Sequence, residues 1–324
     1  MLGFLARRIG YLVPVLLAVS LLTFLIASLL PGDLAYAMLG DQATPEAVAA
    51  LRHDMGLDRP IWWRYLHWLG GILQGDFGRS FRTGESVLGA ILARLPVSLE
   101  LMLLAEVAGL AIGIPLAVQC AINSGGGVDR FLTGVAFAKL SIPSFMIAIL
   151  LIYIFAVELG VLPATGYVPF AEDHLGNLRA FVLPALTLAF AEWPVLMRVL
   201  RSDMIATLQE DYIALAKAKG LKPIRILFVH ALKPSSLTLV TVAGINIGRL
   251  IGGTVIVESV FALPGIGRLL IAAIYTRDFM IMQGVVLFVA AGFVIVNFLV
   301  DMLYALLDPR IRHAHSRCRH RRWV

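Results

Sequence analysis

The chain alternates long apolar stretches with short polar segments. A bilayer core of about 30 Å requires roughly 20 mostly apolar residues in a helix, because every backbone amide must be hydrogen-bonded without water. We therefore predict an all-α integral membrane protein with six membrane-spanning helices, at residues 9–30, 97–119, 133–157, 180–200, 236–257 and 284–306. Three of these helices should be kinked or interrupted by prolines, at Pro115, Pro143, Pro184 and Pro194.

The first apolar stretch follows two arginines, as the core of a secretory signal peptide does. The uncharged run from Ile9 to Leu30 is longer than the roughly 7–15 residues of such a core, and no small-x-small cleavage site precedes Pro31. We therefore expect this segment to remain attached as the first membrane helix.

Composition and charge support this interpretation. Apolar residues make up 59% of the 324 residues and charged residues 15%, against roughly 45–50% and 25% in soluble domains, which argues against a soluble enzyme. With a cytoplasmic N-terminus, 17 Lys and Arg residues lie in cytoplasmic segments and three in the two short outer loops. This asymmetry predicts that both termini are cytoplasmic. Cys120 and Cys318 are too few for a disulfide framework or a clustered metal site.

The region 31–96 is too polar to span a membrane and is expected to form short extracytoplasmic helices. Thr44 is a suitable N-cap for a helix over Glu46–Met55, and Gly56 can end it. The segment Pro60–Leu73 places aromatic and aliphatic residues at helical spacing. This pattern fits either an amphipathic helix in the membrane interface or a cap over the helix bundle.

Sequence signatures of catalysis are absent. No Gly-Lys dipeptide occurs, so a Walker A loop is excluded, and no His-Glu-x-x-His or Gly-x-Ser-x-Gly motif occurs either. The basic tail 310–324 contains three histidines and Cys318, which leaves a metal site or a segment attracted to anionic lipid as alternatives. We expect no catalytic residue and no metal site in this chain.

The loop 201–235 between the fourth and fifth segments contains a short predicted helix from Glu210 to Gly220. Acidic residues favour its N-terminal end, lysines favour its C-terminal end, and alanines occupy the middle. Gly220 should end the helix with a positive φ angle. Alanines allow another surface to approach closely, so this helix either docks a partner or lies under the bundle.

The same loop resembles the coupling-helix motif of ABC-importer permeases, with Gly220 at the position of the motif glycine. Further segments resemble the oligopeptide/dipeptide permease family. They are Leu30–Asp33, Met55–Pro60, Gly75–Ser80, Ser141–Ser144, Leu162–Tyr167, Glu258–Gly267, Val296–Asn297, Asp301 and Leu307–Arg310. Two positions depart from the pattern, because Ala214 replaces the acidic residue of the motif and His230–Ser236 lacks a clear leucine-proline ending.

The resemblance implies the type I ABC importer permease fold, as a single membrane-spanning domain over residues 1–324 in the cytoplasmic (inner) membrane. It implies four kinds of partner: a second homologous permease, two ATP-binding subunits or domains that hold ATP and Mg, an extracytoplasmic peptide-binding protein, and membrane lipid. The chain itself would hold no cofactor and bind no nucleic acid. The coupling residues implied are Glu210, Asp211, Tyr212, Ala214, Ala216, Lys217, Ala218, Lys219 and Gly220.

Charged residues within the apolar segments are candidates for function, because they are costly in a membrane. We select Glu192, Asn246 and Arg249 as candidates for the translocation path, with an ion pair inside the bundle as the alternative. A proton-coupled transporter using Glu106 and Glu192, a membrane scaffold, and an ABC permease for glutathione or nickel complexes remain alternative functions. The sequence does not select the substrate.

Overall fold

The structure is a computed structural model that describes residues 2–29, 36, 44–54, 56, 58–80 and 82–307. Helices dominate these residues, and the one β feature described is an isolated bridge between Arg79 and Ser86. The helices are α1 (Leu2–Leu29), α3 (Pro45–Asp54), α4 (Ile61–Leu73), α5 (Val87–Ile122), α6 (Gly127–Leu140), α7 (Ser144–Leu151), the π-helix η2 (Ile152–Glu158), α8 (His174–Leu208), α9 (Asp211–Ala218), α10 (Pro223–Arg225), the π-helix η3 (Ile226–Leu232), α11 (Lys233–Val260), α12 (Ile266–Thr276) and α13 (Phe279–Leu307).

Four of the described helices are long and apolar enough to cross a membrane. They cover Val87–Ile122, His174–Leu208, Pro223–Val260 and Phe279–Val300, and each contains one of the predicted segments wholly or in large part. A bent helix pair raises the number to five if it counts as one span. In α1 the apolar stretch Leu12–Ile26 is shorter than a full span among the residues described. The multi-pass, all-helical class is confirmed, and the count of six spans stays a prediction.

The third predicted segment is not a straight helix. Residues Gly127–Leu140 and Ser144–Glu158 are bent by 102° at the break between them. Pro143 directly precedes α7 with φ −59° and ψ 145°. This extended conformation prevents a continuous α-helix from running through Pro143 into α7. The expectation that Pro143 interrupts its helix is confirmed. Pro184 and Pro194 instead lie inside α8, which continues through both.

The chain divides into two compact units, and the larger consists of residues 99–263 and 295–324. Its core is built around α8, whose buried residues include Trp193, Leu196 and Met197. A Cβ added at Gly109 of α5 would contact Ala189 and Glu192, and one at Gly113 would contact Trp193, Leu196 and Met197. The part of α5 in this unit therefore runs parallel to α8, with glycines at the closest approach.

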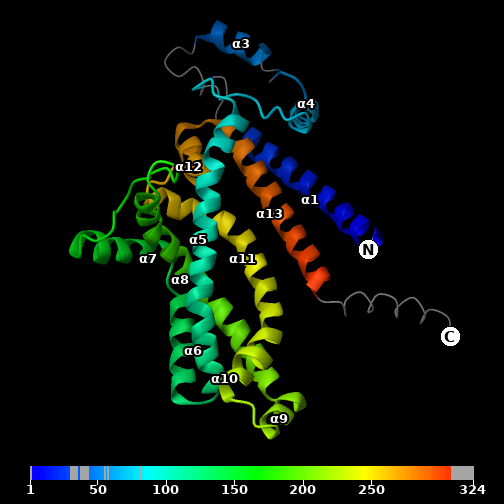
Figure 1. Cartoon of the computed structure of the whole chain (residues 1–324). Helices are drawn as coiled ribbons and strands as arrows, with labels where there is room; N and C mark the ends of the chain where they lie inside the picture. Colours follow the sequence, from blue (N-terminus) through cyan, green and yellow to red (C-terminus); the bar gives the residue numbers. More distant parts are fainter. Residues whose placement is uncertain are drawn as a thin grey trace, which may run out of the picture. The chain divides into compact units, whose positions relative to one another are not determined.

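Helix α11 runs antiparallel to α8 in the same unit. Thr207 near the end of α8 lies within 3.2 Å of Ser235 at the start of α11, whereas Gly253 late in α11 faces Leu188 early in α8. Figure 1 shows these two helices side by side, with α9 and α10 beyond the end of α8 at which α11 begins. These directions agree with the alternating topology predicted for successive spans.

The smaller unit contains residues 1–98 and 264–294. Its core joins the start of α5 to α12 and α13 through Val87, Ala90, Ile91, Ile266, Leu269, Ala273, Ile281 and Val285. The Gly75–Ser80 segment is tied to the turn before α13, because the Ser80 hydroxyl donates to Asp278; just after the segment, the Arg82 guanidinium donates to the Thr276 carbonyl. This motif therefore holds a helix corner together.

Local predictions for the residues after α1 are confirmed in the smaller unit. Thr44 Oγ1 accepts a hydrogen bond from the Ala47 amide at 3.2 Å, as expected of an N-cap, and Gly56 follows α3 with φ +61°. One face of α4 packs on α1, where Tyr65 contacts Phe24. Trp62 and Leu66 are exposed on α4, so the helix combines features of both predicted alternatives. The tail 310–324 lies outside the described residues.

Candidate coupling helix and buried charges

Helix α9 forms where the charge pattern predicts it. Asp211 lies in its first turn and Lys217 in its last, which favours the helix dipole at both ends. Gly220 then adopts φ +72° while its amide donates to the Lys217 carbonyl at 2.9 Å. The predicted positive φ is confirmed. Glycine suits this position because a side chain is strained in the left-handed region.

One face of α9 attaches the helix to the rest of the larger unit. Ile213 and Ala216 are buried and pack with Ile226, with Leu208 and Leu221 beside them. The Tyr212 hydroxyl also donates to the His230 carbonyl of η3 at 3.1 Å. The base of α9 is thus anchored to the segment that continues into α11.

The opposite face of α9 is exposed. Asp211, Ala214, Leu215 and Ala218 are exposed at positions i, i+3, i+4 and i+7, which share one side of a helix. We call these four residues the outer face of α9. Leu215 is 56% exposed, a large apolar side chain among small ones. Leu215 is absent from the coupling residues predicted from the sequence, although its helical spacing from Asp211 and Ala218 places it on the same side of the helix.

The other residues assigned to this helix divide by exposure. Ala216 is buried and therefore belongs to the anchor, as does the hydroxyl group of Tyr212. The remaining four are exposed at the two ends of α9, namely Glu210, Lys217, Lys219 and Gly220.

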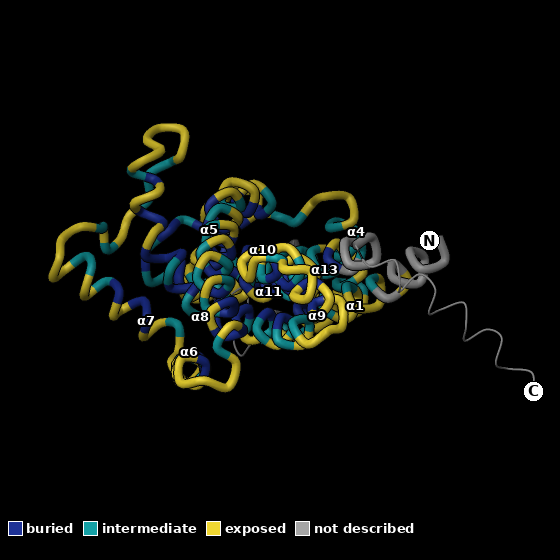
Figure 2. The backbone as a smooth tube through the Cα atoms, turned by 60° about the horizontal axis from the view of Figure 1, so that its bottom comes forward, coloured by how far each residue is buried: buried dark blue, intermediate teal, exposed yellow. Residues whose placement is uncertain are grey.

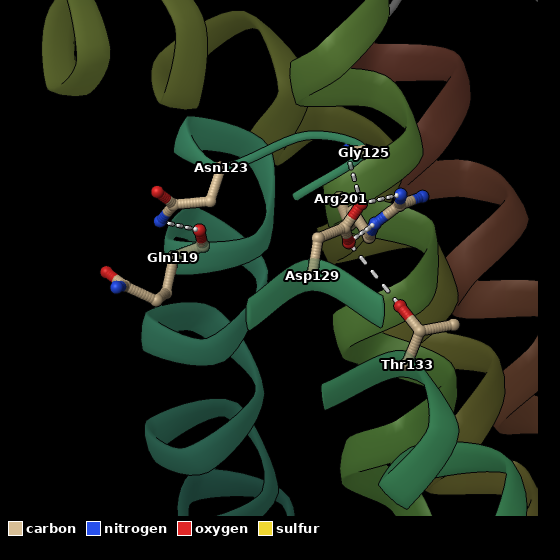
Figure 3. Close-up of polar contacts among 6 residues, drawn as sticks. All are labelled: Gln119, Asn123, Gly125, Asp129, Thr133 and Arg201. Carbon is tan, nitrogen blue, oxygen red and sulfur yellow. Dashed lines mark hydrogen bonds and ion pairs between the residues drawn. The ribbon is translucent and has the colours of Figure 1, made fainter. Parts of the chain in front are cut away.

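Seven residues before the end of α8, a buried ion pair joins α8 to α6 (Figure 3). The Asp129 carboxylate accepts two hydrogen bonds from the Arg201 guanidinium, at 2.5 Å from Nε and 2.6 Å from the terminal nitrogen. It also accepts the Gly125 amide at 2.9 Å and the Thr133 hydroxyl at 3.5 Å. The Asp129 side chain is 3% exposed. Sequence reasoning counted Arg201 only as a topology marker, because nothing in the sequence pairs residues so far apart.

The three path candidates lie on the two antiparallel helices, Glu192 on α8 and Asn246 with Arg249 on α11. Glu192 and Asn246 are buried, at 7% and 1% exposure, whereas Arg249 is exposed in this single chain. Arg249 and Lys139 act electrostatically on Glu192. Within the described residues, however, no ion pair within 4 Å is found between Glu192 and Arg249. The alternative of an internal ion pair is therefore not met by a direct contact of Glu192 with Arg249 in the isolated chain, where the two residues interact only at longer range.

Glu106 on α5 lies near Glu192, and we call Glu106, Glu192 and Asn246 the buried polar layer. Glu106 is 4% exposed and interacts electrostatically with Glu192, which also faces Gly109 one turn later on α5. Neither oxygen of Glu106 has a hydrogen-bond partner among the described residues, and neither has the Asn246 side-chain nitrogen. The buried polar layer thus contains polar groups that no described residue pairs.

Known families and relatives match nearly the whole chain. The model of the family described as binding-protein-dependent transport system inner membrane component matches residues 109–313, and that of its N-terminal region matches residues 1–102. A protein of Brucella abortus (strain 2308) named for a peptide transport system permease is 41% identical over 97% of this chain and 100% of its own length. The dipeptide transport system permease protein DppB of Escherichia coli (strain K12) is 36% identical over 97% of this chain and 99% of its own length.

A solved structure supports the fold. A chain of the inward-facing MetNI methionine ABC transporter superposes with a TM-score of 0.56 at 18% identity, over 68% of this chain and 96% of that one. At this identity the likeness concerns the fold alone, which this chain shares with a chain of that ABC transporter. The chain therefore belongs to the binding-protein-dependent transport system inner membrane component family, as a multi-pass membrane protein similar to peptide permeases.

Proposed function

We propose that this chain is the permease subunit of an ATP-driven importer of short peptides. Together with a second homologous permease it would form the translocation pathway, and ATP and Mg would bind to partner ATPase chains. An extracytoplasmic binding protein would deliver the peptide. The relatives named for peptide and dipeptide transport support this substrate class.

The observation that carries the proposal is the outer face of α9. Four exposed residues, three of them small or acidic around Leu215, lie on a helix whose other face is fixed by Ile213 and Ala216. A helix that is fixed on one side and presents mostly small side chains on the other suits docking into a groove of a partner protein. In this proposal, closure of the ATPase pair upon binding ATP moves α9, and the permease alternates its access.

The test is a substitution confined to the outer face. Leu215→Glu should preserve membrane insertion and the α9 fold, because the side chain is exposed, but should abolish capture of the ATPase chains and peptide-stimulated ATP hydrolysis. Val161→Glu, at a 51% exposed residue between η2 and α8 and outside the candidate spans, is the matched apolar-to-acidic control. Normal stimulation by the Leu215→Glu complex would refute the docking role of α9.

A proton-coupled transporter is the second candidate, favoured by the buried carboxylate of Glu106, which no described residue hydrogen-bonds. This chain alone in proteoliposomes should then take up peptide in response to a pH gradient. The ATP-driven importer requires instead that uptake depend on the ATPase chains and on ATP.

A further inference from the structure

Glu192 and Arg249 lie at the same level of two antiparallel helices. Leu188 early in α8 faces Gly253 late in α11. Glu192 lies four residues after the first and Arg249 four residues before the second, about one helical turn in each case. The carboxylate and the guanidinium interact electrostatically, yet no hydrogen bond or ion pair within 4 Å joins them among the described residues. Opposite charges thus lie at one level of the larger unit without direct contact.

A second cation reaches the same level from α6. Asp129 on α6 binds Arg201 on α8. Lys139 lies ten residues after this aspartate, and Glu192 nine residues before this arginine, so the two are level on antiparallel helices. Lys139 is half-buried and acts electrostatically on Glu192. Figure 2 shows α8 as mainly buried and α6 as largely exposed. The Glu192 carboxylate therefore has a cation on each of two neighbouring helices.

Polar atoms around this level lack hydrogen-bond partners. One oxygen of Glu192, both oxygens of Glu106 and the side-chain nitrogen of Asn246 are buried and unpaired among the described residues. Asn246 precedes Arg249 by one turn on α11. Buried polar groups in folded proteins are nearly always hydrogen-bonded, because leaving them unpaired is costly. A ligand that pairs these groups would remove the cost.

The ligand that fits this arrangement carries charges of both signs. The two glutamates and the two cations, Lys139 and Arg249, carry formal charges that sum to zero. A zwitterion preserves this balance, whereas a net anion or cation would leave an uncompensated charge among largely buried groups. A short peptide with free ends is such a zwitterion. Its ammonium group suits a carboxylate, and its carboxylate suits a guanidinium, which binds it through two parallel hydrogen bonds.

We propose that Glu192 and Arg249 bind the two charged ends of a short peptide as it passes through the permease. Glu192 accepts hydrogen bonds from the terminal ammonium, and Arg249 donates to the terminal carboxylate together with the Asn246 amide. Packed helix axes are about 8–10 Å apart, and two or three extended residues at about 3.5 Å each cover that distance. The site therefore favours dipeptides and tripeptides. Identification of the ligand as a peptide rests on the proposed function.

The experiment measures equilibrium binding of alanylalanine to the full-length chain, purified with the subunits that it retains and without a binding protein. N-acetyl-alanylalanine and alanylalanine amide each lack one terminal charge and should bind at least about tenfold more weakly. Glu192→Gln should abolish only the discrimination against the acetylated peptide. Arg249→Gln should abolish only the discrimination against the amide, and Arg249→Lys, which keeps the charge, should retain it.

Arg198→Gln is the matched control. It removes an exposed cation from α8, six residues after Glu192, and should leave both discriminations unchanged. Equal affinity of the unsubstituted protein for the three peptides, including no detectable binding of any, would overturn the proposal. So would single variants at Glu192 and Arg249 that lose both discriminations or neither, because residues that only hold the bundle together, or that pair with a second permease, do not distinguish the two peptide ends.

Failure of this site and failure of the proposed function give different results. ATP-dependent dipeptide uptake by a complex that binds the three peptides equally would refute the site alone. Opposite specificities of Glu192→Gln and Arg249→Gln, in a chain that captures no ATPase and supports no ATP-dependent uptake, would refute the proposed function and leave the site in place.

Discussion

Asp129 and Glu106 are both buried carboxylates of the larger unit, yet their surroundings differ. Asp129 accepts four hydrogen bonds, two of them from Arg201, whereas no donor among the described residues reaches Glu106. A buried charge is tolerated when it is paired and hydrogen-bonded, and is costly otherwise. Asp129 therefore joins helices within this chain, whereas Glu106 has no hydrogen-bond partner in the part of the chain that the structure describes.

The largest effect is expected from breaking the satisfied pair. Arg201→Met should lower the free energy of unfolding by about 3 kcal/mol, because Asp129 would remain buried without its cation. Thermal denaturation of the purified subunit measures the change. Adding Asp129→Asn to Arg201→Met should recover part of the loss, since the buried charge is then removed.

Arg198→Met serves as the control for this pair. Arg198 is exposed one turn earlier on α8 and lies 5.5 Å from the ring centre of Phe137. Its substitution should cost less than about 1 kcal/mol. If Arg201→Met and Arg198→Met lowered the free energy of unfolding equally, the contacts of Asp129 with Arg201 would stabilise the protein no more than an exposed arginine does.

A smaller effect is expected at the unpaired carboxylate. Glu106→Gln should change the free energy of unfolding of the isolated subunit by less than about 1 kcal/mol, because no hydrogen bond from a described residue is lost. The same substitution in the assembled transporter sharpens the comparison. A destabilisation seen only in the complex would assign the missing partner of Glu106 to another subunit. If Glu106→Gln instead destabilised the isolated subunit as much as Arg201→Met does, the two carboxylates would not differ in their contribution to stability.

The smallest effect is expected between Glu192 and Arg249. These residues lack a direct contact, so a double-mutant cycle with Glu192→Gln and Arg249→Gln should give a coupling free energy of no more than about 0.5 kcal/mol. Denaturation of the four purified proteins yields this value. A coupling energy above about 1.5 kcal/mol would indicate that the two side chains approach in solution.

Much of the local structure could be predicted because it depends on neighbouring residues. The N-cap at Thr44, the ends of α9 and the positive φ of Gly220 each follow from residues within one or two turns. The sequence did not predict which face of α9 is buried. The buried side of an alanine-rich helix depends on its neighbours, here Ile226 and Leu208, which lie elsewhere in the chain. The role of this helix in coupling stays a prediction.

Other features depend on residues distant in the sequence. The Asp129–Arg201 pair joins positions 72 residues apart, and no local pattern identifies one as the partner of the other. The bend after α6 was anticipated from Pro143, but its angle of 102° is not encoded by proline alone. Continuous apolar sequence on both sides of the break looks the same whether a span is straight or sharply bent.

The segment from Pro223 to Val260 has a mechanical consequence. Its α10, η3 and α11 parts follow one another without a gap as one helical rod of 38 residues, and the 28 residues of α11 alone extend roughly 42 Å at about 1.5 Å each. The rod touches α9 near one end, through Ile226 and the carbonyl of His230, and carries Asn246 and Arg249 much farther along. A small tilt imposed at the α9 end is therefore converted, by leverage, into sideways displacement at the level of the buried polar layer.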